Sequence, residues 1–393
     1  MKVLFVMNGN FSSHGTSEHL LKAAIEALAK AGNQVVVLQM LKSTDELSLP
    51  ESLSALGVKT DGIKVIPSKK DNLVSRYLHA IQNYRNYSKL LKNNSDADAV
   101  FLQSTNVAGI AVGLVRKYIK KTVVTYNVQD ILPYNLSYSG KLKKNSLVFK
   151  VLAAVQRYGY NHADHIITIS EDMKDTLVAD GVEASKIEVI YNWSYQDEPY
   201  ENVDQSPVAN MFNKNFFNVV YAGNIGVMQN VDIVIEAAKL MKDDDSVWFH
   251  IIGNGVYKEK LEAKAKEYGI KNISFWPMQP PELAPAIYSA ADVNVIPLVK
   301  DVFRTALPSK TATCFACGKP VVFAIGKESK FGQKVMNETG CPVVESDNAK
   351  ELADAIKTVK RGEVRCNTID FFKKNMSISA NSWKYGEIIE GKN

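Results

Sequence analysis

The feature that most restricts the fold of this chain is an alternation between short apolar runs and longer runs with helical periodicity. Residues 2–7 predict a strand that is apolar after Lys2, a loop of small residues follows, and apolar side chains then recur every three or four positions across residues 17–31. Gly32 ends this helix, and residues 34–38 form the next strand, apolar after Gln34. A strand, a small-residue loop, a helix and a second strand in this order predict a doubly wound parallel α/β sheet.

The same alternation starts a second time after a break in the middle of the chain. Residues 194–215 are polar and show no period, which is typical of a linker. A chain of 393 residues is long enough for two domains. We therefore predict two Rossmann-like parallel-sheet domains that face each other across a cleft. The predicted parts are a first domain at 1–196, a linker at 197–215, a second domain at 216–375, and a terminal helix at 376–393 that packs back on the first domain.

The positive charge of the chain is concentrated in one block. Residues 64–157 contain 16 Lys and Arg against four Asp, a net charge of +12, whereas the whole chain carries only +5. The cations of this block alternate with Tyr, Leu and Phe, a pattern that suits peripheral contact with an anionic membrane. Ordinary solvated helices are the alternative. No nucleic-acid recognition motif accompanies the charge, so nucleic acid is not expected as a partner.

Cysteine use and hydropathy indicate where the protein acts. No apolar run reaches the roughly 20 residues that cross a bilayer. Cys314 and Cys317 lie one helical turn apart, and no histidine cluster accompanies them, so we expect reduced thiols packed in the fold. Aspartates such as those at 96 and 243 are expected in solvated turns. We predict a cytoplasmic protein, peripheral at the inner face of the cell membrane, with no metal site.

Residues 303–323 form the segment with the clearest ligand-binding pattern. Pro308 suits the first position of a helix, Gly318 can end that helix, and an apolar strand follows. The start of a helix offers free amides and a positive dipole end, to which Lys310 adds a cation, so the segment predicts a phosphate site. An ordinary helix cap before a core strand is the alternative. The predicted neighbours of Lys310 in this site are Arg304, Thr305, Ser309, Thr311 and Thr313.

Two glycine turns are predicted at the same edge of the second sheet. Residues 223–226 and 253–255 each follow an apolar strand, and ligands of doubly wound sheets bind beyond the carboxyl ends of the strands. The alternative is that glycine is needed in such a turn only for its backbone conformation, with no ligand nearby. Together with the helix start, the turns predict a site for a nucleoside diphosphate. Its further predicted residues are Gly15, Gly223, Asn224, Gly253, Gly255 and Met278.

Several motifs resemble those of one enzyme family. The motifs are YAGNIGVMQNVDIVIEA at 221–237, FHIIGNGVYKEKL at 249–261, LPSKTATCFACGKPVV at 307–322, NVQDILP at 127–133 and ITISEDMKDTLVADGV at 167–182. They resemble retaining GT-B glycosyltransferases of glycosyltransferase family 4, over residues 1 to about 357. The PSK variant at 308–310 is similar to the subgroup that contains N-acetyl-L-fucosamine transferases and related surface-polysaccharide enzymes.

The resemblance implies a reaction and its substrates. It implies transfer of a hexosyl or N-acetylhexosaminyl group, with retention, from a nucleotide-diphosphate donor, expected to be a UDP-sugar. The expected acceptor is a polyprenyl-diphosphate-linked glycan, in capsule, exopolysaccharide or O-antigen biosynthesis. No cofactor is expected beyond the nucleotide sugar itself. A UDP-sugar epimerase on the same fold and a non-catalytic GT-B partner subunit remain as alternatives.

The chain departs from the family pattern at its charged donor contacts. The family has two glutamates eight positions apart, the second of which holds the donor ribose, and here Thr305 and Thr313 occupy these positions. The family Arg and Lys that clamp the diphosphate correspond to Asn224 and Gln229. Lys310 is therefore expected to be the main catalytic cation.

A second catalytic candidate follows from the first half of the chain. The residue before Asp130 is a histidine in the family and is Gln129 here, which leaves Asp130 as the polar candidate near the acceptor. Asp130 would orient or deprotonate the acceptor hydroxyl. A structural turn aspartate beside Pro133 is the alternative.

Overall fold

The computed structural model describes residues 1–12, 18–66 and 73–391, which form two compact units. Unit 1 comprises Met1–Tyr191 and Asn381–Asn393, and unit 2 comprises Asn192–Ala380. The first unit thus ends at Tyr191 rather than at the predicted residue 196. Within the described ranges, no helix has both the length and the apolar character that a membrane crossing requires.

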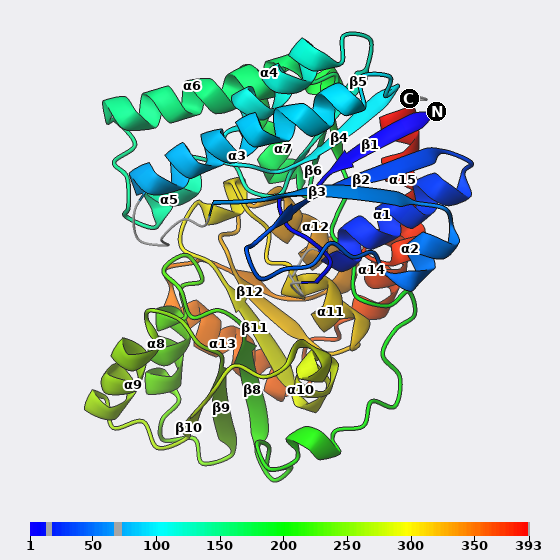
Figure 1. Ribbon diagram of the computed structural model, residues 1–393. Coiled ribbons are helices and arrows are strands. Elements are labelled where there is room, and N and C mark those ends of the chain that lie inside the picture. Colours follow the sequence, from blue (N-terminus) through cyan, green and yellow to red (C-terminus); the bar gives the residue numbers. More distant parts are fainter. Residues whose placement is uncertain (13–17, 67–72, 392–393) are drawn as a thin grey trace. The chain divides into compact units, whose positions relative to one another are not determined.

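A seven-stranded parallel sheet, formed by described residues, is the centre of unit 1 (Figure 1). Its order is β3-β2-β1-β4-β5-β6-β7, so β1 pairs with both β2 and β4 and the winding reverses there. The strands are β1 (Lys2–Val6), β2 (Gln34–Leu41), β3 (Lys59–Lys64), β4 (Ala99–Gln103), β5 (Val123–Val128), β6 (His165–Thr168) and β7 (Ile187–Val189). Because both faces of the central strands are buried, their sequences are mostly apolar.

Helices connect the strands of unit 1 in the predicted alternating order. They are α1 (Glu18–Lys30), α2 (Glu51–Ala55), α3 (Leu73–Asn93), α4 (Ala108–Tyr118), α5 (Tyr134–Tyr138), α6 (Leu147–His162) and α7 (Glu171–Ala179), with a 3-10 turn at Ala184–Lys186. Helix α4 packs against both α3 and α6, so these three form one layer (Figure 1).

Strand β3 differs from its prediction. The sequence predicted a strand at 63–66, whereas β3 spans Lys59–Lys64 and includes Asp61 and Gly62. As the terminal strand in the sheet order, β3 pairs on one side only and remains half-exposed. A strand in this position has no continuous apolar run, and for this reason hydropathy missed its first residues.

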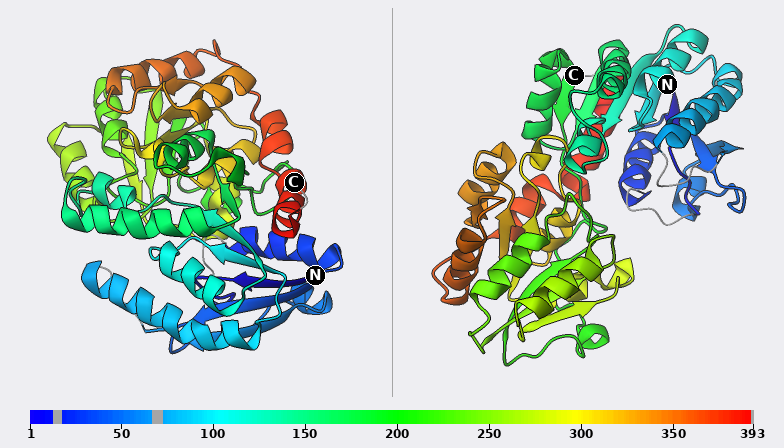
Figure 2. Two further views of the ribbon diagram at one scale, coloured as in Figure 1. Left: turned by 90° about the horizontal axis from the view of Figure 1, so that it is seen from above. Right: turned by 90° about the vertical axis from the view of Figure 1, so that its left-hand side faces the viewer.

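The last helix, α15 (Ile378–Glu390), extends into unit 1. The Tyr385 ring lies 6.0 Å from the ring of Phe101 on β4, and Asn33 donates a 2.5 Å hydrogen bond to Glu390. The left-hand view of Figure 2 shows this helix, in red, beside α1, in blue. The apolar side of α15 thereby completes the core of unit 1.

Unit 2 is built around a second parallel sheet, whose six strands are formed by described residues. Its order is β10-β9-β8-β11-β12-β13, and the winding reverses between β8 and β11. The strands are β8 (Phe217–Ala222), β9 (Val247–Ile252), β10 (Ile273–Trp276), β11 (Val293–Pro297), β12 (Val321–Ala324) and β13 (Val343–Val344). This switch point is where ligands of doubly wound sheets bind.

Helices and short turns surround this second sheet. The helices are α8 (Asp232–Leu240), α9 (Lys258–Glu267), α10 (Ala284–Ala290), α11 (Lys310–Ala316), α12 (Lys330–Thr339), α13 (Ala349–Lys360) and α14 (Thr368–Asn375). The 3-10 turns are Ser206–Val208, Pro281–Leu283 and Val302–Arg304. The core lies between the sheet and its helices and includes Phe249 on β9 and Leu352 on α13, both fully buried.

The stretch predicted as a linker is part of unit 2. Ser194 N donates to Met376 O at 3.3 Å, and Tyr200 N donates to Ala316 O at 2.8 Å. These main-chain bonds attach the stretch to α14 and to the end of α11. Its polar, aperiodic sequence reflects an irregular segment that crosses a domain surface.

Candidate functional site

The amine of Lys310 lies at the carboxyl end of β8, beside the point where the winding of the second sheet reverses. Its Nζ donates a 2.6 Å hydrogen bond to the carbonyl oxygen of Ala222, the last residue of β8. The same nitrogen stands 4.0 Å from the centre of the Tyr221 ring, a cation–π distance. Two neighbouring residues of one strand therefore hold the lysine in place before any ligand binds.

Burial lowers the pKa of Lys310 to about 8, because the protein surroundings disfavour the charged amine. The side chain is half-buried, and no carboxylate in the described part of the chain pairs with it. At neutral pH the amine still carries its proton. It is therefore a partly desolvated cation without a counter-ion, which an anionic ligand would stabilise.

Helix α11 begins at Lys310 rather than at the predicted Pro308. Ser309 occupies the N-cap position but makes no capping hydrogen bond with its side chain, and the carbonyl of Pro308 accepts hydrogen bonds from the amide and hydroxyl of Thr311. Gly318 ends the helical segment with a left-handed φ of 68°, which confirms the predicted stop. Because α11 has only seven residues, its dipole is small, and we assign the electrostatic role to Lys310.

Gly223 gives Lys310 the space it occupies. A Cβ at this position would lie 2.6 Å from the Lys310 amine, and the φ of Gly223 is 142°, which other residues rarely adopt. Glycine is thus required here for two reasons, the turn after β8 and the path of the lysine.

The two glycine turns pack against each other through their main chains. A Cβ on Gly253 would lie 1.8 Å from Gly223 O, and one on Gly255 would lie 2.2 Å from Ile225 O. Ile225 N also donates a 2.9 Å hydrogen bond to Asn254 O. This contact between turns explains the glycines at 253 and 255 without a ligand.

The positions that carry Arg and Lys in the resembled family hold a neutral pair. Asn224 is exposed, and its Nδ2 donates a 3.1 Å hydrogen bond to Oε1 of Gln229. Met278 follows β10 and is 47% exposed. These side chains offer hydrogen bonds and an apolar surface, but no charge, to a ligand at this edge.

The remaining predicted donor residues divide into exposed and buried groups. Ser309 is exposed, as is Arg304, whose Nε pairs with Asp301 Oδ1 at 3.1 Å. The hydroxyls of the three threonines are buried and bonded to the protein. Thr305 donates to Val302 O at 3.2 Å, Thr311 donates to Pro308 O at 2.8 Å, and Thr313 lies 3.3 Å from the hydroxyl of Ser194.

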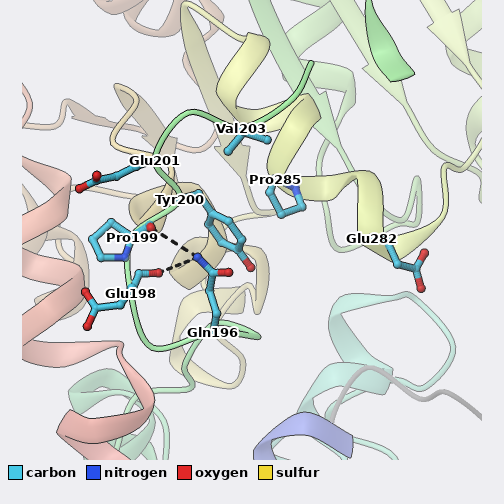
Figure 3. A pocket seen from close by; sticks show the side chains of 8 residues that line it. All are labelled: Gln196, Glu198, Pro199, Tyr200, Glu201, Val203, Glu282 and Pro285. Carbon is cyan, nitrogen blue, oxygen red and sulfur yellow. Dashed lines mark hydrogen bonds between the residues drawn. The ribbon is translucent and has the colours of Figure 1, made fainter. Parts of the chain in front are cut away.

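Unit 2 also contains a recess of about 560 Å³ beside residues 196–203 (Figure 3). Glu198, Glu201 and Glu282 line it together with Tyr200 and Pro285. Three carboxylates would repel a diphosphate, and none of the predicted site residues lies in the lining. This recess is therefore not the predicted phosphate site.

In unit 1, Asp130 follows the carboxyl end of β5. Its Oδ1 accepts a 2.8 Å hydrogen bond from Nδ2 of Asn135, which lies on α5. Desolvation by the surrounding protein raises the pKa of Asp130 to about 6, against the smaller lowering effect of the Asn135 hydrogen bond. The side chain nevertheless has access to solvent. Gln129 donates a 3.1 Å hydrogen bond to Asn127 Oδ1. The predicted residue Gly15 lies outside the described residues.

Two family descriptions together account for most of the chain. Residues 17–193 match Glycosyltransferase Family 4, and residues 203–376 match Glycosyl transferases group 1. The chain belongs to the GT-B glycosyltransferases, of the family 4 type. The two parallel sheets and the order of this glycosyltransferase's elements confirm the predicted fold class of paired Rossmann-like domains.

Individual relatives of this glycosyltransferase include two bacterial proteins. It is 29% identical over 238 residues to WcaI of Escherichia coli K12, named as a colanic acid biosynthesis glycosyl transferase, a match that covers 59% of this chain and 57% of WcaI. It is 25% identical over 298 residues to WbjE of Pseudomonas aeruginosa, named as a glycosyltransferase, covering 74% of both chains.

Solved structures share the fold at low sequence identity. Sucrose-phosphate synthase from Thermosynechococcus elongatus superposes with a TM-score of 0.77 at 14% identity, covering 100% of this chain and 99% of the synthase. HepE from Anabaena, solved with UDP and glucose, gives a TM-score of 0.66 at 16% identity, covering 99% of this chain and 95% of HepE.

The contacts that hold the Lys310 side chain of this glycosyltransferase were not predicted from the sequence. Tyr221 lies under the Lys310 amine, although 88 residues separate Ala222 from Lys310 in the chain. Likewise, Ser194 in the predicted linker reaches Thr313. Local sequence patterns do not show which residues so far apart in the chain will meet. These contacts form only in the folded domain.

Among the described residues, no group of three or more His, Cys, Asp or Glu side chains is placed to hold a metal ion. Cys314, within α11, and Cys317, which follows its last residue, are buried free thiols.

Proposed function

We propose that this glycosyltransferase transfers a sugar, with retention, from a UDP-sugar to a lipid-linked glycan in the synthesis of a bacterial capsule, exopolysaccharide or O-antigen. The names of the bacterial relatives and the motifs quoted above support the pathway class. The HepE complex with UDP supports the choice of nucleotide by analogy.

The Lys310 amine is the observation that carries the proposal. Breaking the bond between the anomeric carbon and the phosphate oxygen leaves negative charge on the departing diphosphate. A cation about 4 Å from that oxygen contributes roughly 4 kcal/mol at an effective dielectric constant near 20, about a thousandfold in rate. Lys310 lies at the switch point of the sheet and already has its amine fixed by Ala222 and Tyr221.

The fixed position of the amine favours catalysis as well as binding. A lysine in solvent would lose side-chain entropy on meeting the diphosphate, whereas this one has lost much of it already. In our proposal the diphosphate takes over the partner role of the Ala222 carbonyl, and the Tyr221 ring continues to support the cation. Asn224, Gln229 and Ser309 supply neutral hydrogen bonds nearby.

On the acceptor side, we assign Asp130 to the acceptor hydroxyl. A carboxyl with a pKa of about 6 is ionised at neutral pH and is a stronger base than an ordinary aspartate. Its partner Asn135 fixes one oxygen and leaves the other for the substrate. Retention would follow if the acceptor oxygen attacks the anomeric carbon on the face from which the diphosphate leaves. The proposal therefore requires no enzyme nucleophile.

Two alternatives remain to be separated by experiment. An epimerase needs an acid and a base near the donor, yet the two family glutamate positions hold buried threonines, and Asp301 already pairs with Arg304. A non-catalytic partner subunit would share the neutral donor contacts but show no turnover of any nucleotide sugar.

The test is an assay of UDP release from UDP-sugars, with and without a polyprenyl-diphosphate-linked acceptor. Release that depends on the acceptor supports transfer. Isomerisation of the donor at C2 without an acceptor would indicate the epimerase, and no reaction across a panel of nucleotide sugars would indicate the partner subunit. A product with inverted anomeric configuration would contradict the retention assigned here.

We also propose that the protein works in the cytoplasm, peripherally bound to the inner face of the cell membrane, because its acceptor would be anchored there by a lipid.

A further inference from the structure

The outer face of α6 carries a continuous apolar stripe. Leu147, Val151 and Ala154 recur at the spacing of one helix face and are all exposed, Leu147 by 77% and Val151 by 53%. Val148 adds a further apolar side chain that is 57% exposed at the start of the helix. Soluble helices normally present polar side chains on this face, so the stripe requires an explanation.

The stripe is not the result of a loosely seated helix. The face of α6 next to the stripe packs on α4 so closely that a Cβ on Gly109 would lie 2.3 Å from Val155 O, and one on Gly159 would lie 2.6 Å from the carbonyl carbon of Ala108. The Tyr158 ring lies at this contact, 3.3 Å from such a Cβ on Gly109, and stacks on the His162 ring at 3.9 Å. At the helix start, the Phe149 ring meets the Tyr134 ring edge-on at 5.3 Å. Helix α6 therefore has a fixed rotation, which directs the stripe outward.

Basic side chains, with no acidic residue in the same segment, lie close to the stripe in the sequence. The sequence from 131 to 163 contains no Asp or Glu, whereas it contains five Lys or Arg. Lys141, Lys143, Lys144, Lys150 and Arg157 are all exposed. The positive character is therefore local to the stripe and is not offset by acids within this segment.

We infer that α6 and the lysine-rich turn before it dock on an anionic lipid bilayer. The 16-residue helix, about 24 Å long, would lie in the membrane plane with the stripe among the acyl chains and the lysines at the headgroups. The combination of apolar side chains with cations on one fixed face matches this partner. A nucleic acid would use the cations but leave the stripe in water.

This inference deepens one part of the proposed function, the membrane location, and does not depend on sugar transfer. It restricts the predicted membrane contact from the whole basic block at 64–157 to the last third of that block. The test measures lipid binding rather than catalysis. Its result therefore does not depend on whether the protein transfers a sugar, and each of the two proposals can be refuted without the other.

The test is flotation of the full-length protein with vesicles of phosphatidylcholine alone and with 30% phosphatidylglycerol. We expect binding to the anionic vesicles that weakens with salt. Exchanging Leu147→Ser and Val151→Ser together should lower the partition coefficient at least roughly 30-fold, since each apolar side chain is worth more than a factor of five at an apolar interface. Exchanging Lys143→Gln and Lys144→Gln should lower it roughly 30-fold.

Matched controls come from unit 2. Leu240 on α8 is 53% exposed, and Lys260 and Lys266 are exposed on α9, so Leu240→Ser and the pair Lys260→Gln with Lys266→Gln change similar surface elsewhere. These should bind vesicles as the unchanged protein does. All exchanged side chains are at the surface, so the melting temperature should be unaffected, and hydrogen exchange of residues 141–152 should slow on vesicle addition.

The inference is overturned if the protein stays with the vesicle-free fraction at 30% phosphatidylglycerol, or if the stripe variants bind as well as the controls. Sedimentation that shows a dimer lost in the Leu147→Ser and Val151→Ser variant would overturn it too, because a second copy of the chain would then cover the stripe.

Discussion

The proton on Lys310 leads to a prediction about how nucleotide affinity depends on pH. The pKa of this amine is about 8 before a ligand binds, because burial disfavours its charge. A bound diphosphate would favour the charged form and raise the pKa again. Below pH 8 the cation is present in advance, whereas above pH 8 binding must also take up a proton. Affinity for UDP should therefore be nearly constant below pH 8 and fall above it.

The magnitude follows from the pKa. At pH 9 about one free protein in eleven carries the proton, compared with about nine in ten at pH 7, so the dissociation constant should rise roughly tenfold between these values. Close to one proton should be taken up for each UDP bound at pH 9, and about a tenth of one at pH 7.

Calorimetric titration with UDP at pH 7, 8 and 9 measures both quantities, if two buffers of different ionisation enthalpy are used at fixed ionic strength. The matched control is Lys310→Arg, because arginine stays cationic throughout this range. Any titration of the nucleotide itself appears equally in the control. A constant affinity from pH 7 to 9, or the same decline in Lys310→Arg, would refute the role of this amine.

Three further predictions concern turnover and stability. Lys310→Gln should lower kcat between tenfold and about a thousandfold at saturating donor. The melting temperature should not fall, because the lost hydrogen bond to Ala222 O is offset by the removal of a partly desolvated charge. Gly253→Ala should cost at least about 3 kcal/mol in urea unfolding, since its Cβ would meet Gly223 O at 1.8 Å, whereas Gly269→Ala, with a left-handed φ but open space, should cost about 1 kcal/mol. Burial lowers the pKa of His250 to about 4, so as the pH falls the unfolded chain binds a proton at this histidine before the folded chain does. The free energy of unfolding should therefore fall by roughly 2 kcal/mol from pH 7 to pH 5. This loss should be absent in His250→Gln.

The fold could be predicted largely from the sequence because buried parallel strands have continuous apolar runs. The mostly apolar runs at 247–252 and 343–344 coincide to the residue with β9 and β13. The errors occur where burial is incomplete. Strand β3 is half-exposed, and the stretch after Tyr191 is held by main-chain bonds that leave no trace in hydropathy.

The candidate site was only partly predictable. Lys310 was identified from its place at a helix start, and the structure puts its amine at the end of β8. The Tyr221 ring beneath it could not be foreseen, because local pattern does not report which distant strand a helix start approaches. The buried state of Thr305 and Thr313 also depends on tertiary packing, since threonine is common on surfaces as well as in cores.

The contact between the two glycine turns has a practical consequence for altering this enzyme. The two turns meet through main-chain atoms, supported by the buried side chains of Tyr221 and Ile225, and the side chains of Asn224, Gln229 and Met278 take no part in these contacts. These three positions can therefore be varied together in a library without loosening the scaffold that carries Lys310. Changes in sugar or base preference should be obtainable there at little loss of folded protein.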